Sequence, residues 1–443
     1  MNIKKSAVSV VLAAAAVSAF GAVPEVTSVT MSQASDSRLV TITYTLSDAP
    51  AVITLDVQTN ANTSAAADDP GWSSIGGRAM WNAEGDVWKK IETGSRTITW
   101  RPDLSWPDHR IADGCARAVV TAWATNNTPD YMSVDITATG GEGTQTYYPA
   151  ADFVPGGVTN NAIYKTSTIL MRKIMAKNVT WMMGSVAETG RTAARETPHQ
   201  VTLSNNYYIG VFPVTQTQWQ QITGYNPSEF STERAMRPVD KVTYTDIRQG
   251  VGTASTAASA TGGVYPDPPY GNSFLGLLRN KTKLDFDLPS EAQWEFAARA
   301  GNGEGYWGDG SAMNISDGKD ERLDVLGRYT YNGGMIGPDS TTRPPTDCAV
   351  TNGTPIVGSY LPNVWGLYDV HGGVWEWCLD WYADNITALN GAVNTTSSDN
   401  RVRRGGTWGY AAGNCRPAYR NKGDPATRDR YNGFRVVCTA GLQ

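Results

Sequence analysis

Side chains that bind metals are scarce in this sequence. Its 443 residues include three histidines, His109, His199 and His371, and five cysteines, none of which are spaced as Cys-x-x-Cys. Zinc sites usually take four such ligands from closely spaced pairs, so the sequence argues against zinc. An iron site of three histidines would require these scattered residues to meet in space, and no pattern indicates that they do.

Charge and long apolar runs are scarce as well. Only 18% of the residues are charged and the net charge is −5, so no basic surface for nucleic acid is expected. The longest apolar run, residues 7–17, follows Lys4 and Lys5 and precedes small residues. It is too short to span a bilayer but typical of a secretory signal. We therefore expect a signal peptide at residues 1–22, no membrane span, and an exported protein that is periplasmic, cell-surface or secreted.

Residues 23–140 have the pattern of an all-β module. Apolar and polar residues alternate from Val40 to Leu46 and from Ile53 to Val57, with the turn Ser47-Asp-Ala-Pro50 between them, which predicts a hairpin. Several further short strands favour an immunoglobulin-like or fibronectin-like sandwich. We find no catalytic constellation in it and expect a spacer or adhesion module. Residues 141–165, rich in Gly, Thr, Asn and Pro, are expected to form a linker.

The remaining residues, 166–443, combine a few helices with many loops. Capping-box spacing marks three helix starts, at Thr215, Thr243 and Ser290, and Gly301 is placed to end the third helix. Short strands and loops follow. The expected fold class is therefore α+β, with a β-sandwich followed by a loop-rich domain.

A series of ordered motifs runs through this second domain. They include Leu288-Pro-Ser-Glu-Ala-Gln-Trp-Glu, Asn363-Val-Trp-Gly-Leu-Tyr, His371-Gly-Gly-Val-Trp-Glu-Trp, Arg404-Gly-Gly-Thr-Trp and Gly433-Phe-Arg. The domain thereby resembles the formylglycine-generating enzyme family, also called the sulfatase-modifying factor family. The resemblance implies a variant of the C-type lectin fold with little regular secondary structure.

The resemblance also implies where a copper site would lie. Enzymes of the family oxidise a cysteine of a sulfatase to formylglycine, using oxygen and copper held by two cysteines. The second cysteine corresponds to Cys415, but the first falls on Tyr410, and a phenol is a poor ligand for the soft ion Cu(I). Thr407 and Trp375 match the family's serine and tryptophan, whereas Gly373 replaces an asparagine. The candidate catalytic residues are thus Cys415, Thr407 and Trp375, in a copper site that lacks one ligand.

Cys378 follows the segment that lines the family's cleft. It would form either a disulfide with Cys415 or a displaced pair of thiolates. We expect the disulfide, because nearby thiols of an exported protein usually oxidise.

The family's calcium ligands correspond to Asp369, Gly372, Val374 and Glu376. Two carboxylates with carbonyls between them suit a hard cation, so we expect a structural Ca²⁺. The alternative is that the two carboxylates pair with nearby arginines.

Three functions follow from the resemblance. The first is an enzyme that oxidises a protein thiol. The second is a ligand-binding or display protein, similar to the variable proteins of diversity-generating retroelements, with a protein or glycan bound at residues 407–432. The third, an iron enzyme like the sulfoxide synthases, has the least support. For the second function the candidate surface residues are Tyr410, Asn414, Asn421, Asp424 and Tyr431. The arginines of the C-terminal tail, residues 403–435, are expected to form structural ion pairs.

Overall fold

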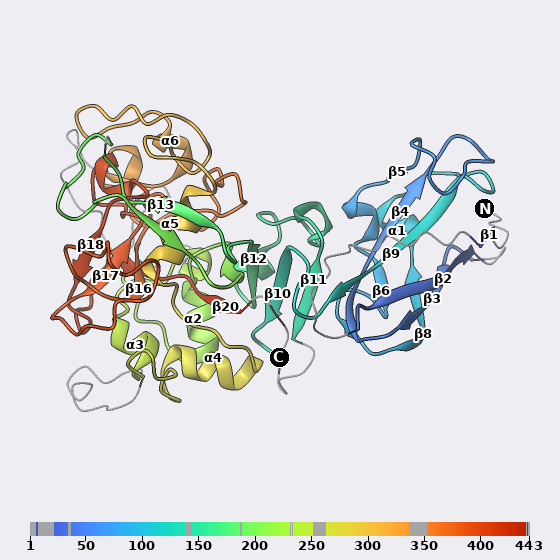
Figure 1. Cartoon of the computed structure of the whole chain (residues 1–443), viewed down its shortest axis with the longest axis horizontal. Helices are drawn as coiled ribbons and strands as arrows, with labels where there is room; N and C mark the ends of the chain where they lie inside the picture. Colours follow the sequence, from blue (N-terminus) through green and yellow to red (C-terminus); the bar gives the residue numbers. More distant parts are fainter. Residues whose placement is uncertain are drawn as a thin grey trace. The chain divides into compact units, whose positions relative to one another are not determined.

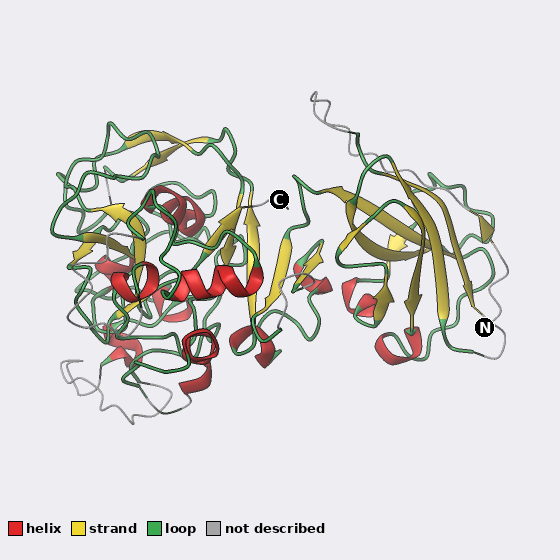
Figure 2. Cartoon of the chain, turned by 90° about the horizontal axis from the view of Figure 1, so that it is seen from below, coloured by secondary structure: helices red, strands yellow, loops and turns green. Residues whose placement is uncertain are grey.

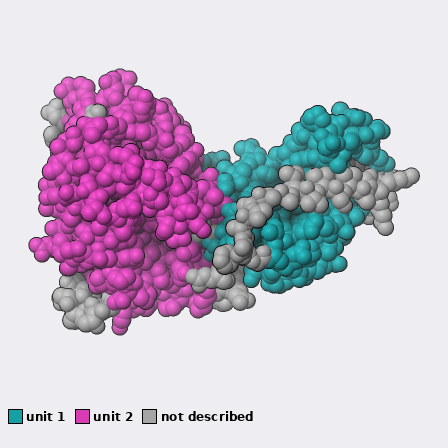
Figure 3. Space-filling model, viewed as in Figure 1, with its two compact units in different colours: residues 1–133, 145–161, 440–443 teal, residues 134–144, 162–439 magenta. Residues whose placement is uncertain are grey.

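The computed structural model divides the chain into two compact units (Figure 3). Unit 1 comprises residues 1–133, 145–161 and 440–443, and unit 2 comprises residues 134–144 and 162–439. The structure describes residues 6–7, 22–33, 37–138, 144–186, 188–230, 232, 234–250, 263–335, 352–439 and 441. Most of the expected signal peptide and Cys348 lie outside these residues.

Unit 1 is a β domain of two sheets (Figure 1). One sheet has the order β1-β2-β3-β8-β6, and the other has the order β5-β4-β7 with β9 also paired to β4. The bounds are β1 Ser6–Ala7, β2 Glu25–Gln33, β3 Val40–Ser47, β4 Ala51–Thr59, β5 Ser73–Ser74, β6 Ala83–Gly85, β7 Lys90–Ile91, β8 Gly94–Trp100 and β9 Ala116–Ala124, with the short helix α1 at Pro102–Ser105. This agrees with the expected β domain.

The predicted hairpin between β3 and β4 is wrong. Strand β3 pairs with β2 and β8, whereas β4 pairs with β5, β7 and β9. Burial alternates along β3, whereas Ala51–Leu55 of β4 is buried on both faces, and Ile42 and Ile53 are both fully buried. The apolar residues of the two strands can be buried between two facing sheets as well as on one sheet.

The segment expected to be a linker contains regular structure. Strand β11 is Gln145–Tyr148, and short 3-10 turns follow at Ala151–Phe153 and Ala162–Lys165, whereas strand β10, Tyr131–Asp135, lies before this segment. Gly and Pro in this stretch therefore mark turns between short elements.

Unit 2 contains five helices in its described part, and most of the remainder is loop (Figure 2). Thr215, Thr243 and Ser290 each cap a helix through the predicted capping box. The third helix ends at Arg299, with Ala300 in the left-handed region, so Gly301 follows the cap. The bounds are α2 Gln216–Thr223, α3 Tyr244–Arg248, α4 Phe274–Thr282, α5 Glu291–Arg299 and α6 Leu323–Leu326.

The strands of unit 2 are short. The bounds are β12 Thr168–Ile174, β13 Thr180–Met183, β14 His199–Thr202, β15 Tyr207–Gly210, β16 Trp375–Trp381, β17 Arg401–Arg404, β18 Asn421–Gly423, β19 Asn432–Gly433 and β20 Val437–Thr439. A core built around Trp294, Leu367 and Val402 joins α5 to several of these strands. This loop-rich α+β arrangement is the expected fold class. No helix in the described ranges is long and apolar enough to cross a membrane.

Candidate functional site

The C-terminal tail of unit 2 forms most of a small sheet. Its order is β18-β17-β16-β19, and only β16 comes from earlier in the chain. Strand β17 pairs antiparallel with β16 and β18, while β19 pairs parallel with β16. The sheet therefore places the predicted Trp375 of β16 beside the tail.

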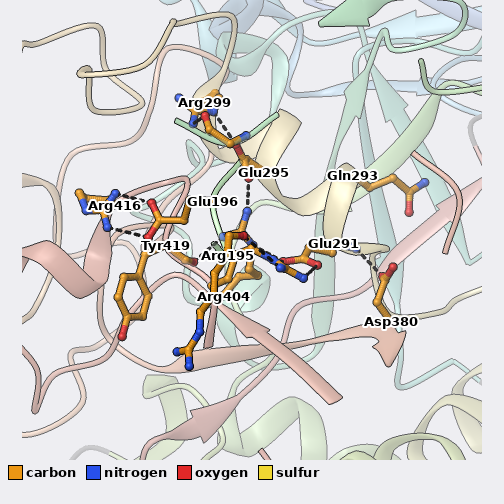
Figure 4. Close-up of polar contacts among 12 residues, drawn as sticks. Arg195, Glu196, Glu291, Gln293, Glu295, Arg299, Asp380, Arg404, Arg416 and Tyr419 are labelled. Carbon is orange, nitrogen blue, oxygen red and sulfur yellow. Dashed lines mark hydrogen bonds and ion pairs between the residues drawn. The ribbon is translucent and has the colours of Figure 1, made fainter. Parts of the chain in front are cut away.

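Buried ion pairs hold the tail against α5 and the loop between β13 and β14 (Figure 4). Glu295 of α5 lies between Arg299 and Arg404, accepting from Arg299 Nε at 2.8 Å and from Arg404. Arg404 also lies 3.3 Å from Glu291, whose other partner is Arg420 at 2.6 Å. This confirms the structural role expected for the tail's arginines.

The same network continues to the residue after Cys415. Arg416 donates to Glu188 at 2.7 Å and to Glu196 at 2.8 Å, and Glu188 lies 3.5 Å from Arg299. The network thus comprises four glutamates and four arginines with side chains no more than 4% exposed: Glu188, Glu196, Glu291, Glu295, Arg299, Arg404, Arg416 and Arg420. Because the network contains as many positive as negative charges, their mutual attraction offsets the free-energy cost of burying them.

An aromatic cluster forms the base of the candidate surface. Trp375 contacts Tyr419 in a stacked arrangement and Tyr410 edge-on, with ring centroids 5.8 Å apart in both pairs. Tyr431 lies 5.7 Å from Tyr410 and 4.7 Å from Trp408. Tyr410 is 41% exposed, whereas Tyr431 is 7% exposed and Trp375 is buried. Tyr410 therefore presents its ring to solvent from a base of buried rings.

The other predicted surface residues differ in exposure. Asp424 is exposed, and Asn414 and Asn421 are half-buried. Asn421 lies on β18 opposite Arg403 of β17. Tyr410 and Tyr431 are the predicted pair in direct ring contact, and Tyr431 supports the surface from beneath.

Cys415 lies beneath this surface as a buried free thiol. It belongs to a cluster with Trp307, Leu323 and Tyr329, and its thiol donates to the Ala411 carbonyl at 3.9 Å. Burial raises the pKa of the Cys415 thiol to about 12. The thiol is thus protonated at neutral pH, whereas a copper ligand must be a thiolate.

The disulfide expected between Cys378 and Cys415 is wrong. Both residues are free thiols, and they lie in different hydrophobic clusters. Cys378 packs in the core with Trp294 and Val402. Burial raises the pKa of Cys378 as well, so the two residues behave as small apolar side chains.

Thr407 is buried and turned away from solvent. Its hydroxyl donates to the Gly373 carbonyl at 3.1 Å, and the Trp408 amide donates to the same oxygen at 3.0 Å. Thr407 therefore fastens the start of the tail to the loop before β16.

The two predicted carboxylate ligands of calcium differ in whether they are free to bind a cation. Both oxygens of Glu376 accept from Arg435, at 2.6 and 2.7 Å, and one also accepts from the Trp294 indole at 2.7 Å. Asp369 is buried, and its Oδ1 has no hydrogen-bond partner. Burial raises the pKa of Asp369 to about 6. Glu376 thus matches the arginine-pairing alternative, whereas Asp369 retains an oxygen suited to a cation.

The histidines do not form a shared site. His371 is buried and contacts the Gly308 amide at 3.0 Å and the Cys415 carbonyl at 3.1 Å. His199 lies on β14 and His109 lies in unit 1. Within the described ranges, no group of three or more His, Cys, Asp or Glu side chains is arranged to hold a metal ion.

Comparison with known proteins identifies the second domain. The sequence profile of the sulfatase-modifying factor enzyme 1-like domain matches residues 170–440, more than half of the chain. The chain belongs to this family.

Individual relatives match different shares of the chain. A chaperone protein LppX from Paenibacillus barcinonensis is 29% identical over 54% of the chain and 81% of its own length. The formylglycine-generating enzyme of Streptomyces coelicolor is 32% identical over 35% of the chain and 47% of the enzyme. The chain thus spans less than half of that enzyme.

Two solved structures are also similar. A variable protein of Treponema denticola is 26% identical, with a TM-score of 0.42, over 61% of this chain and 95% of that one. PvdO from Pseudomonas aeruginosa is 22% identical, with a TM-score of 0.44, over 61% and 94%.

Several residues of the site were not predicted from the sequence. Trp408 and Tyr419 lie within residues 407–432 but were not predicted to belong to the aromatic base. Tyr331, which is 38% exposed, lies near the tail and was not predicted either. Arg403 was also missed, although it directly precedes the Arg404-Gly-Gly motif. Alternation along β17 was a signal for Arg403, because neighbouring residues of a strand face opposite sides.

Proposed function

We propose that this member of the sulfatase-modifying factor family is an exported binding protein, and that it does not oxidise thiols. The ligand would bind the surface of residues 407–432, centred on Tyr410. The observation that carries this proposal is the replacement of a copper ligand by a solvent-exposed tyrosine on a rigid aromatic base.

The chemistry of Cys415 supports the absence of oxidase activity. Cu(I) is held by thiolates, and here the position of the first thiolate is a phenol. The remaining thiol is buried, and its raised pKa disfavours the thiolate. One protonated thiol beneath a tyrosine is a poor copper site.

The aromatic base supports binding. Tyrosine buries a large area on binding at little cost in conformational entropy, since two torsions orient its ring. The Tyr410 ring contacts both Trp375 and Tyr431, which restricts its motion before a ligand arrives. Gly409 lets the Tyr431 ring pack closely against the backbone, since a Cβ at Gly409 would lie 2.5 Å from that ring.

Peptides selected from a random displayed library against the purified protein test this proposal. We expect Tyr410→Ala to weaken the selected peptides at least about tenfold, because a central aromatic residue contributes 2 kcal/mol or more. Tyr270→Ala is the matched control, since Tyr270 is 49% exposed on the loop before α4. Selected peptides that bind Tyr410→Ala and the wild type equally would refute the proposal.

The structural calcium remains a proposal that rests on Asp369. We expect Ca²⁺ to raise the melting temperature of the wild type, since an ion that binds the folded state stabilises it. Asp369→Asn should abolish this shift, and a wild type that melts identically in Ca²⁺ and in a chelator contradicts it.

Export is also proposed, from the apolar run at residues 7–17. N-terminal mass analysis of protein from an expressing bacterium tests it. An intact N-terminus on protein recovered from the cytoplasm would exclude this proposal.

A further inference from the structure

We propose that the surface around Tyr410 recognises an acidic segment of a partner protein, with Arg403 as the anchor for a carboxylate. This inference rests on the proposed binding function and names the class of partner. It is carried by a guanidinium that is not fully buried and that, unlike five other arginines of the tail, lacks an acidic partner among the described residues.

Arg403 lies on the face of the sheet that bears the aromatic base. In the antiparallel register Arg403 is opposite Trp377 of β16 and Asn421 of β18, so these three side chains share one face. The guanidinium lies 5.4 Å from the Trp377 ring centroid. Its partner Asn432 directly follows Tyr431, whose ring contacts Tyr410. The anchor is thus next to the exposed tyrosine.

The contacts of Arg403 are with neutral groups. Nη1 donates to the Asn432 side-chain oxygen at 2.7 Å, and Nη2 donates to the Lys422 carbonyl at 2.6 Å. Nε has no hydrogen-bond partner, and the Nδ2 group of Asn432, itself fully buried, has none either. Both of these donors are shielded from solvent, so a carboxylate would meet the positive charge at Nη2, on the exposed side of the guanidinium.

Five arginines of the tail differ from Arg403 in this respect, whereas Arg401 of β17 also lacks an ion pair among the described residues but is buried against the Trp381 and Tyr244 rings. Arg404, Arg416, Arg420, Arg428 and Arg435 each form an ion pair with a glutamate or an aspartate. For Arg403, no carboxylate oxygen among the described residues lies within 4.0 Å. Asp429 is the nearby acidic group, and burial outweighs its effect, so the pKa of Arg403 is lowered. A half-buried charge without an ion pair is costly unless a partner supplies one.

A second cation flanks the same surface. The exposed Lys319 places its Nζ 5.0 Å from the ring centroid of Tyr331. Tyr331 is 38% exposed and directly follows Thr330, whose amide donates to the Tyr410 carbonyl at 3.0 Å. Gly318 lies against Ala411, since a Cβ at Gly318 would be 3.2 Å from that of Ala411. Lys319 and Arg403 therefore flank Tyr410, with Tyr331 beside Lys319.

The mix of residues favours a polypeptide over a polysaccharide. Tyrosine and arginine are the residues most enriched at the energetic centre of protein interfaces. The large flat ring that would best stack on a sugar, Trp375, is only 1% exposed. We therefore assign the carboxylates to aspartate or glutamate side chains of a protein.

Binding of fluorescent poly-L-glutamate to the full chain, with polygalacturonate and poly-L-lysine as comparison polymers, tests this inference. We expect binding to poly-L-glutamate that Arg403→Gln weakens at least about tenfold, the effect of removing one partner of a desolvated charge pair. Lys319→Gln should weaken it about twofold to threefold, as for a charge at the rim. Arg428→Gln, which removes a tail arginine already paired with Asp246, should leave it unchanged.

Each of the following results would contradict a different part of the proposal. Binding of polygalacturonate in preference to poly-L-glutamate would overturn the polypeptide assignment, and equal effects of Arg403→Gln and Arg428→Gln would overturn the anchor. Should Arg403→Gln fail to fold by circular dichroism, the Lys319→Gln result and loss of binding at high salt decide instead. Selected peptides that need Tyr410 but carry no excess of acidic residues would refute this inference alone, whereas peptides indifferent to Tyr410 refute the proposed function.

Discussion

Glu295→Gln is expected to lower the free energy of unfolding by about 3–5 kcal/mol, because it leaves two buried arginines without their shared carboxylate. Glu295 is fully buried and accepts from Arg299, Arg404 and the Gly184 amide. The substitution keeps the shape of the side chain and removes its charge. Urea unfolding followed by tryptophan fluorescence measures the loss.

Asp384→Asn is the matched control for this experiment. Its carboxylate pairs with Arg195 at 3.2 Å, but the two side chains are 62% and 42% exposed, and such a pair contributes no more than about 1 kcal/mol. A Glu295→Gln protein that unfolds at the same urea concentration as Asp384→Asn would show that the buried network does not hold the tail.

The acid dependence of stability follows from the same residue. Burial alone would raise the pKa of Glu295, but Arg299 and Arg404 outweigh it and the pKa is lowered. The stability gained from Glu295 is therefore complete at neutral pH. It is lost only as the pH falls below about 4.3, where an unperturbed glutamate titrates.

Gly406→Ala is expected to destabilise unit 2 by about 2–4 kcal/mol, since a left-handed residue gains a Cβ and a close contact at once. Gly406 has φ of +79°, and its added Cβ would lie 2.5 Å from the Cys415 sulfur and 2.8 Å from the Cys415 Cα. Thermal unfolding measures the effect. The same change would displace Cys415, which lies beneath the surface.

Gly413→Ala is the control within the same tail. No heavy atom lies within 4 Å of a Cβ built at Gly413, so its substitution should change stability by less than about 1 kcal/mol. Equal destabilisation by the two substitutions would mean that the packing of Gly406 against Cys415 does not constrain the tail.

Local chemistry made the helices of unit 2 predictable. The capping boxes at Thr215, Thr243 and Ser290 need only residues three positions apart, and all three form as expected. Helix α4 was missed, although Ser273 caps it by accepting a hydrogen bond from the Gly276 amide. Its N3 position is glycine, so the capping-box spacing that marked the other helices is absent.

Pairings between distant residues were harder to predict. The strands β3 and β4 are adjacent in sequence, but they lie in different sheets. Cys378 and Cys415 follow neighbouring motifs, yet core packing separates them into different clusters. Spacing along the chain reveals which side chains are buried and does not reveal which of them meet.

The candidate site was predictable to the extent that motifs marked it. The resemblance drew attention to Trp375 and Tyr410, whose rings are 5.8 Å apart in the structure. The unpaired charge of Arg403 was beyond prediction, because it depends on where five other arginines find their carboxylates. The buried, charge-balanced network holds the backbone of the tail in place, so the exposed side chains of the tail are not needed for folding.

An aldehyde assay tests most directly whether the protein oxidises thiols. The purified protein is incubated with copper, oxygen, a reductant and a Cys-x-Pro-x-Arg peptide, and the peptide is analysed by mass spectrometry. We predict no aldehyde above that formed without protein, because Tyr410 and a buried protonated Cys415 do not hold Cu(I). Repeated turnover to formylglycine that disappears in Cys415→Ser would contradict this prediction and identify the protein as an oxidase.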